Sequence, residues 1–150
     1  MYARSYMRSF LGLEHFTMPD TPIEIHQGDI FYGLDLCAHE VQKATDSGLY
    51  ISYKAKGAKI YFAVYDILPI LQRNYFPEYL YDTHTVWLSN ITSVADGLIC
   101  ISQTVADEVT HWAREHQKKP SKTLKVTSAH LGADLAHNAH TPIHFSEYEH

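Results

Sequence analysis

Residues 57–69 read GAKIYFAVYDILP, and this stretch decides the fold class. Its residues 58–65 are mostly apolar and rich in aromatic and β-branched side chains, and an aspartate and a turn follow them. This pattern predicts a strand buried inside a sheet, with Asp66 at its carboxyl end. Three further runs have the same character and predict three more strands: residues 29–36, 97–101 and 124–129.

The segments between these strands have helical patterns. Residues 42–56 predict one helix with Gly48 as its weak point, and the apolar side chains of residues 80–95 recur on one helical face. Residues 105–116 repeat that stripe, after a capping-box spacing at residues 104–107. Alternating strands and helices predict an α/β fold: a Rossmann-like parallel sheet with flanking helices, right-handed crossovers and both faces covered.

Length and composition predict one globular domain, since the chain has 150 residues of which 45% are hydrophobic. The net charge of -5, without a basic stripe, argues against a nucleic-acid partner. The sequence contains no apolar run long enough to span a membrane and no signal peptide, which predicts a cytoplasmic location. We assign residues 1–134 to the domain, which the pattern predicts to be incomplete, and residues 135–150 to a linker or tail.

The cysteines and histidines do not form a recognisable metal motif. Cys37 and Cys100 lie in apolar runs without a CxxC partner, which predicts two buried thiols. His39-Glu40 does not continue into a zinc-protease motif, so we predict no metal site. The glycine-rich motifs of dinucleotide-binding and P-loop proteins and the nucleophile elbow of serine hydrolases are also absent from the sequence.

Four polar side chains lie at the carboxyl ends of the predicted strands: Asp35 within the last residues of the first strand, and Asp66, Ser102 and His130 directly after the other three. Ligands bind beyond the carboxyl ends of parallel strands, so we expect these side chains to line one site. Structural alternatives remain open for three of them. Asp66 can form a turn hydrogen bond, Ser102 can be a helix N-cap, and His130 can be a satisfied histidine in the core or at the rim.

An aromatic cluster follows the turn after Asp66. Tyr75, Tyr79 and Tyr81 lie close together in the sequence, beside Phe76 and Pro77. Aromatic rings stack on sugar rings, and they also serve as ordinary packing. The sequence leaves both interpretations open.

Three stretches together resemble the family 4 (group 1) glycosyltransferases of bacterial polysaccharide synthesis, in the subgroup of O-antigen and capsule mannosyltransferases. They are residues 28–36 (GDIFYGLDL), residues 57–70 with the following YFP at 75–77, and residues 95–106 (ADGLICISQTVA). Residues 130–134 (HLGAD) are similar to the end of the first domain of that family. The resemblance spans about Gly28 to Asp134.

The resemblance implies a GT-B enzyme, in which two Rossmann-like domains enclose the active site. The first domain holds a glycan or lipid-linked acceptor, and the second, missing from this chain, holds the nucleotide-sugar donor. The parent enzyme is expected to transfer a sugar such as mannose, with retention, during lipopolysaccharide O-antigen synthesis. No cofactor or metal is expected besides the donor, and this chain alone is expected to be inactive.

The resemblance also implies roles for particular residues. Asp66 is expected to be catalytic, and the expected substrate-binding residues are Asp35, Tyr65, Ser102, His130 and Gly132. The parent enzyme is expected to associate peripherally with the inner face of the membrane. The alternative is a non-catalytic interaction or regulatory module of a larger assembly.

Overall fold

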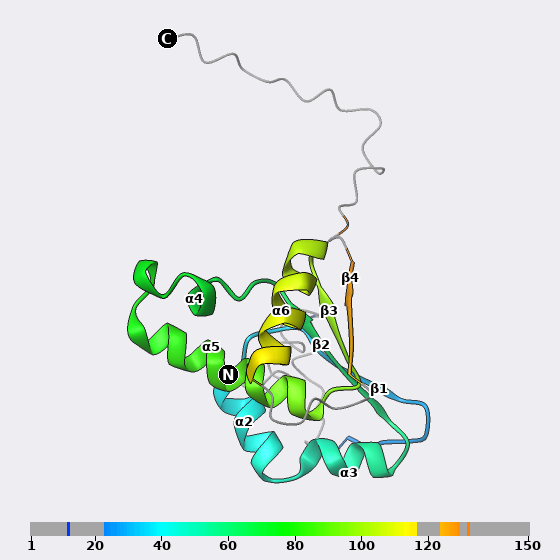
Figure 1. Ribbon diagram of the computed structural model, residues 1–150. Helices are drawn as coiled ribbons and strands as arrows, with labels where there is room; N and C mark the ends of the chain where they lie inside the picture. Colours follow the sequence, from blue (N-terminus) through cyan, green and yellow to red (C-terminus); the bar gives the residue numbers. More distant parts are fainter. Residues whose placement is uncertain (1–11, 13–22, 117–123, 130–131, 133–150) are drawn as a thin grey trace.

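The computed structural model describes residues 12, 23–116, 124–129 and 132. Its sheet has four strands in the order β1-β2-β3-β4, and each neighbouring pair is parallel (Figure 1). The strands are β1 (Ile30–Gly33), β2 (Lys59–Val64), β3 (Gly97–Cys100) and β4 (Lys125–Ser128). Helices connect them, which confirms the predicted α/β class with a Rossmann-like parallel sheet.

The helices follow the predicted alternation, and the largest difference lies between β1 and β2. Helices α2 (Ala38–Asp46) and α3 (Leu49–Ala55) connect β1 to β2, where one continuous helix over residues 42–56 was predicted. That prediction is wrong because Gly48 has φ +71, in the left-handed region that interrupts a helix and that glycine adopts readily. The remaining helices are α4 (Leu68–Leu71), the 3₁₀ helix η1 (Arg73–Tyr75), α5 (Glu78–Val94) and α6 (Gln103–His116).

Helices α2, α5 and α6 lie on one side of the sheet (Figure 1). Right-handed crossovers between strands in the order 1-2-3-4 all pass over the same face, which explains this arrangement. On the helix side, Ile60, Phe62 and Leu98 are almost completely buried. On the opposite side, Ile30 is 67% exposed and Tyr32 is 42% exposed. Among the large apolar side chains of this face of the sheet, such exposure is confined to the outer strand β1, and Ala63 of β2, on the same face, is only 7% exposed. Among the described elements, the helices cover one face and leave the opposite face of β1 exposed.

The core lies between this helical layer and the sheet. Trp87, Leu88 and Ile91 of α5 and Val109 and Trp112 of α6 are buried in it. These side chains belong to the apolar stripes that the sequence predicted for the two helices. Among the helices of the described ranges, none is long and apolar enough to cross a bilayer.

Gly33 allows close packing at the carboxyl end of β1. A Cβ atom at this position would lie 2.5 Å from Cδ1 of Phe62, whose ring is 1% exposed and enclosed by the core. A residue with a side chain would therefore displace the Phe62 ring from its packed position. The chain leaves the sheet immediately after Gly33 and reaches Asp35, the first of the predicted site residues.

Candidate functional site

The carboxyl ends of the strands meet along one edge of the sheet, as predicted. Val64 pairs with Cys100, and Cys100 pairs with Ser128. Asp66 and Ser102 each follow these paired residues by two positions, so the chain carries them out of the sheet at the same level. Neighbouring strands lie about 5 Å apart, which makes this edge a shared rim.

Asp66 lies at this rim, exposed to solvent, two residues after the end of β2. Its Oδ1 accepts a hydrogen bond of 3.0 Å from the backbone N–H of Leu68, in the first turn of α4. Ile67, between them, is fully buried and anchors the turn. The turn hydrogen bond considered from sequence is thus present, and the exposed carboxylate remains accessible to a ligand. Tyr65, immediately before it, is 44% exposed.

Ser102 is the N-cap of α6. Its Oγ accepts a hydrogen bond of 3.2 Å from the N–H of Val105, and its carbonyl oxygen accepts one of 3.1 Å from the N–H of Ala106. The helix therefore begins at Gln103, and the capping box predicted at residues 104–107 is wrong. The half-buried Ser102 hydroxyl has the structural role considered from sequence, beside the rim.

A chain of hydrogen bonds that the sequence patterns do not predict lies beside Ser102. The hydroxyl of Ser128, at the end of β4, donates to Oε1 of Gln103 at 3.1 Å. The amide nitrogen of Gln103 donates to Oδ1 of Asp107 at 2.8 Å. The i, i+4 spacing of Gln103 and Asp107 is a recognisable helical signal, but Ser128 is 25 residues from its partner. These bonds join β4 to the first turns of α6.

Asp35 is exposed and follows the carboxyl end of β1, which is an outermost strand of the sheet. It therefore lies on the same rim as Asp66 and Ser102. Its Oδ1 accepts a 2.8 Å hydrogen bond from the N–H of Leu36, and Oδ2 accepts a weak 3.8 Å contact from Sγ of Cys37. Partial burial and the Asp35 carboxylate raise the pKa of the Cys37 thiol, which therefore stays protonated at neutral pH.

The two cysteines differ in their environments. Cys37 is exposed, so the prediction that both thiols are buried is wrong for this residue, which lies in the loop before α2. Cys100 is buried, and burial raises its pKa to about 11. Neither thiol is ionised at neutral pH, so neither has the character of a catalytic nucleophile.

A cavity of about 350 Å³ lies beside Asp35, between β1 and α2. Aromatic rings of Phe31, Tyr50 and Phe62 line its wall, and Asp35 and Glu40 lie at its polar part. Two of these rings, Phe31 and Tyr50, are in edge-to-face contact with centroids 5.5 Å apart. The candidate edge therefore combines exposed carboxylates with an apolar hollow.

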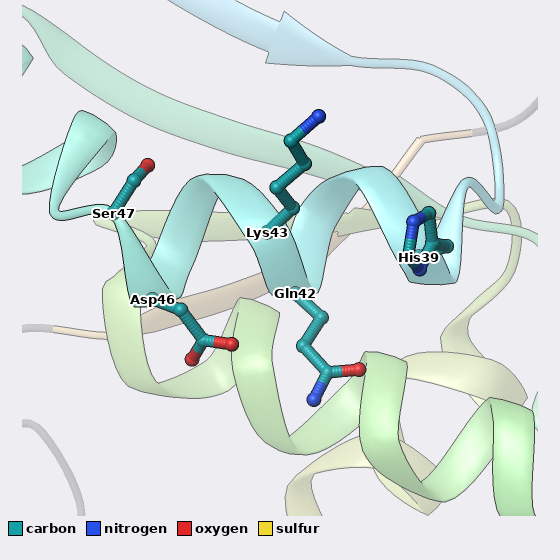
Figure 2. A pocket seen from close by; sticks show the side chains of 5 residues that line it. All are labelled: His39, Gln42, Lys43, Asp46 and Ser47. Atoms are coloured by element: carbon teal, nitrogen blue, oxygen red, sulfur yellow. The ribbon is translucent and has the colours of Figure 1, made fainter.

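A second hollow, of about 560 Å³, lies along α2. Its polar side chains do not point towards a common centre, as those of a catalytic site do. Figure 2 shows its five lining side chains distributed along the helix, with Lys43 pointing away from Gln42 and Asp46. In the ranges that the structure describes, there is no group of three histidine, cysteine, aspartate or glutamate side chains that could hold a metal ion.

The remaining predicted residues lie after β4. Gly132 is exposed, and the position of its absent Cβ has no atom within 4 Å, so no close backbone contact occupies it. His130 and residues 135–150 lie outside the described residues. The structure thus brings Asp35, Tyr65, Asp66 and Ser102 to one edge of the sheet.

The chain is similar to the serotype-specific mannosyltransferase WbdA of Escherichia coli. One such relative is 37% identical over 139 residues, and two others are 35% identical over the same length. The similarity covers 89% of this chain but 16% of each relative, so the chain spans about a sixth of the length of the relatives it matches. No protein-family model and no solved structure matches the chain.

Proposed function

We propose that this chain is the acceptor-side part of a retaining, GT-B-type family 4 glycosyltransferase that transfers mannose during the synthesis of a bacterial surface polysaccharide. The similarity to mannosyltransferases over 89% of the chain is the observation that carries the proposal. The parallel sheet supports it, because its carboxyl edge presents exposed polar side chains where ligands of α/β proteins bind.

The donor in this proposal is a nucleotide-sugar held by a second domain outside this chain. The chain spans 16% of its relatives, which leaves ample length for such a domain in a protein of their size. This chain then supplies one wall of the cleft and does not catalyse transfer by itself. The acceptor is a glycan or a lipid-linked glycan, and the parent enzyme works as a peripheral protein at the inner face of the membrane.

Asp66 is the catalytic residue of the proposal. During transfer, the bond between the anomeric carbon and the phosphate oxygen of the nucleotide breaks, and a bond forms to the oxygen of an acceptor hydroxyl. That hydroxyl must lose its proton, and the exposed Asp66 carboxylate is an acceptor for it. The hydrogen bond from the Leu68 N–H fixes the orientation of this carboxylate. The proposed substrate contacts come from Asp35, Tyr65, Ser102, His130 and Gly132.

One observation favours a second function. Asp66 and Ser102 both accept backbone hydrogen bonds within the chain, as capping residues do. In a non-catalytic interaction or regulatory module of a larger assembly, these bonds would be their whole role. This alternative predicts that sugar transfer does not depend on the charge of Asp66.

A chimera can test the proposal. In this chimera, the chain replaces its matching segment in the Escherichia coli relative, and transfer is measured with a panel of nucleotide-sugars. We expect the chimera to transfer mannose and Asp66→Asn to lower kcat by about 100-fold or more. Asparagine is the informative replacement because its side-chain oxygen still accepts the Leu68 hydrogen bond while the charge is lost.

Two comparisons make the result decisive. Asp66→Ala removes both the charge and the turn hydrogen bond, and His130→Ala tests the residue after β4. Ser89→Ala, at an exposed position of α5, is the control and should leave transfer unchanged. An inactive chimera that folds and expresses normally would contradict the proposed function. An active chimera that tolerates Asp66→Asn would support the interaction-module alternative.

A further inference from the structure

Exposed apolar side chains are concentrated in residues 65–79, the segment that follows β2. Tyr75 is 82% exposed and Tyr79 is 66% exposed, the highest values among the exposed aromatic residues of the described ranges. Leu68 and Leu71 of α4 are exposed to 45% and 41% in the same segment. Exposed apolar groups that gather in one region commonly mark a binding surface.

The segment is held in place by contacts that leave the two tyrosine rings free. Arg73, in η1, forms an ion pair of 2.6 Å with Glu78 in the first turn of α5. The guanidinium of Arg73 also lies 4.3 Å from the centre of the Tyr81 ring. These contacts connect η1 to α5 on either side of Tyr79. The buried side chains of Ile67 and Pro69 anchor the segment to the core. A ligand that binds Tyr75 and Tyr79 therefore orders little additional backbone.

The charge of the segment favours a neutral polar ligand. Its cation, Arg73, is already engaged by Glu78 and Tyr81, and its other charged groups are the carboxylates of Asp66 and Glu78. A net negative surface does not attract the anionic headgroups of a membrane. Exposed amides of Gln72 and Asn74 provide donors and acceptors for the hydroxyl groups of a neutral ligand.

The same segment contains the proposed catalytic residue, Asp66. It leaves the sheet at Asp66, forms α4 and η1, and returns through α5, with α4 packed against α5 (Figure 1). A ligand that has a reacting hydroxyl at Asp66 can extend over this surface.

We infer that Tyr75 and Tyr79 form a platform for sugar units of the acceptor glycan beyond the unit that reacts. This inference rests on the proposed function. The aromatic rings offer flat apolar faces to the C–H faces of sugar rings, and the amides of Gln72 and Asn74 bind hydroxyl groups. The platform makes a multi-unit glycan a better ligand than a single sugar.

Calorimetric titration of the full chain with linear manno-oligosaccharides of increasing length tests the platform. We expect affinity to rise with length, and Tyr75→Ala and Tyr79→Ala each to weaken binding of the longer ligands by about fivefold or more. Tyr75→Phe and Tyr79→Phe keep the stacking face and should bind within about twofold of the wild type. Tyr32→Ala is the matched control, because Tyr32 is an exposed aromatic residue on the sheet.

Three results would overturn the inference. They are no measurable oligosaccharide binding, binding that does not depend on Tyr75 and Tyr79, and an equal loss of affinity in Tyr32→Ala. Binding to phosphatidylglycerol vesicles tests the alternative that the surface contacts a membrane. Vesicle binding that is lost in Tyr75→Ala and Tyr79→Ala, together with no oligosaccharide binding, would overturn the inference and assign the surface to a membrane.

The chimera separates this inference from the proposed function. An active chimera whose KM for the acceptor is unchanged by Tyr75→Ala and Tyr79→Ala contradicts the platform and leaves the transferase assignment intact. An inactive chimera, with tyrosine-dependent oligosaccharide binding by the chain itself, contradicts the transferase assignment and leaves the glycan surface in place. The platform predicts a higher acceptor KM in these variants, with kcat within about twofold of the wild type.

Discussion

The ammonium of Lys54, in α3, lies 3.1 Å from Oδ1 of Asp96, the residue before β3. Oδ2 of the same carboxylate accepts a 2.8 Å hydrogen bond from the N–H of Ile60 in β2. Lys54 also donates to the carbonyl oxygen of Val94 at 3.0 Å. These contacts join α3, the end of α5 and two central strands at the amino edge of the sheet, opposite the candidate site.

We expect Asp96→Ala to lower the free energy of unfolding by about 2 kcal/mol. The substitution leaves the Ile60 N–H and the Lys54 ammonium without their carboxylate, in a region where the Asp96 side chain is 17% exposed. Asp96→Asn should cost less, since an amide oxygen still accepts from Ile60. Urea unfolding measures the free energy of unfolding of both variants. Asp82→Ala, at an exposed carboxylate of α5, is the control and should stay within about 0.5 kcal/mol of the wild type.

The same carboxylate should make stability depend on pH in the acid range. Burial alone would raise the pKa of Asp96, but hydrogen bonds from Ile60 and Lys54 and the positive charge of nearby lysines outweigh it and lower the pKa below the usual 3.8. The unfolded chain therefore takes up this proton at higher pH than the folded chain. The stabilisation is complete above 3.8 and is lost as the pH falls towards the lower pKa of the folded state.

Urea unfolding at pH values on both sides of 3.8, for the wild type and Asp96→Asn, checks this dependence. We expect the stability difference between the two proteins to shrink as the pH falls. A difference that stays constant through this range would show that the charge of Asp96 does not stabilise the fold.

Gly33→Ala should destabilise the fold by about 1–3 kcal/mol, because the added methyl group meets the buried Phe62 ring at 2.5 Å. Thermal unfolding monitored by circular dichroism measures the loss. Gly132→Ala is the matched control, since no atom lies within 4 Å of its Cβ position, and its melting temperature should equal that of the wild type. Equal stability of both variants would contradict the close packing at β1.

The Cys37 thiol should react with iodoacetamide slowly at neutral pH, because partial burial and the Asp35 carboxylate hold its pKa above 9.0. Asp35→Asn removes the carboxylate charge and should raise the rate by about threefold. Mass spectrometry locates the modified residue, and Cys37→Ser gives the background of the folded protein. Buried Cys100 should remain unmodified until the chain unfolds. An unchanged rate in Asp35→Asn would contradict the influence of Asp35 on the thiol.

Parts of the candidate site could be predicted from sequence because they depend on local position. Asp35, Asp66 and Ser102 follow strands that are recognisable by their own composition, and parallel pairing necessarily brings those strand ends to one edge. The contact between Gln103 and Ser128 could not be predicted in this way. It depends on how α6 lies against β4, and its partners are 25 residues apart.

The sequence by itself determined the alternation of strands and helices and therefore the parallel α/β class. The period of the apolar side chains is a property of neighbouring residues, so it can be recognised without knowledge of the rest of the molecule. Only the tertiary structure decided that the described helices cover one face of the sheet, that Cys37 is exposed, and that Lys54 meets Asp96. These features depend on strand order and on contacts between distant segments, which local periodicity does not encode.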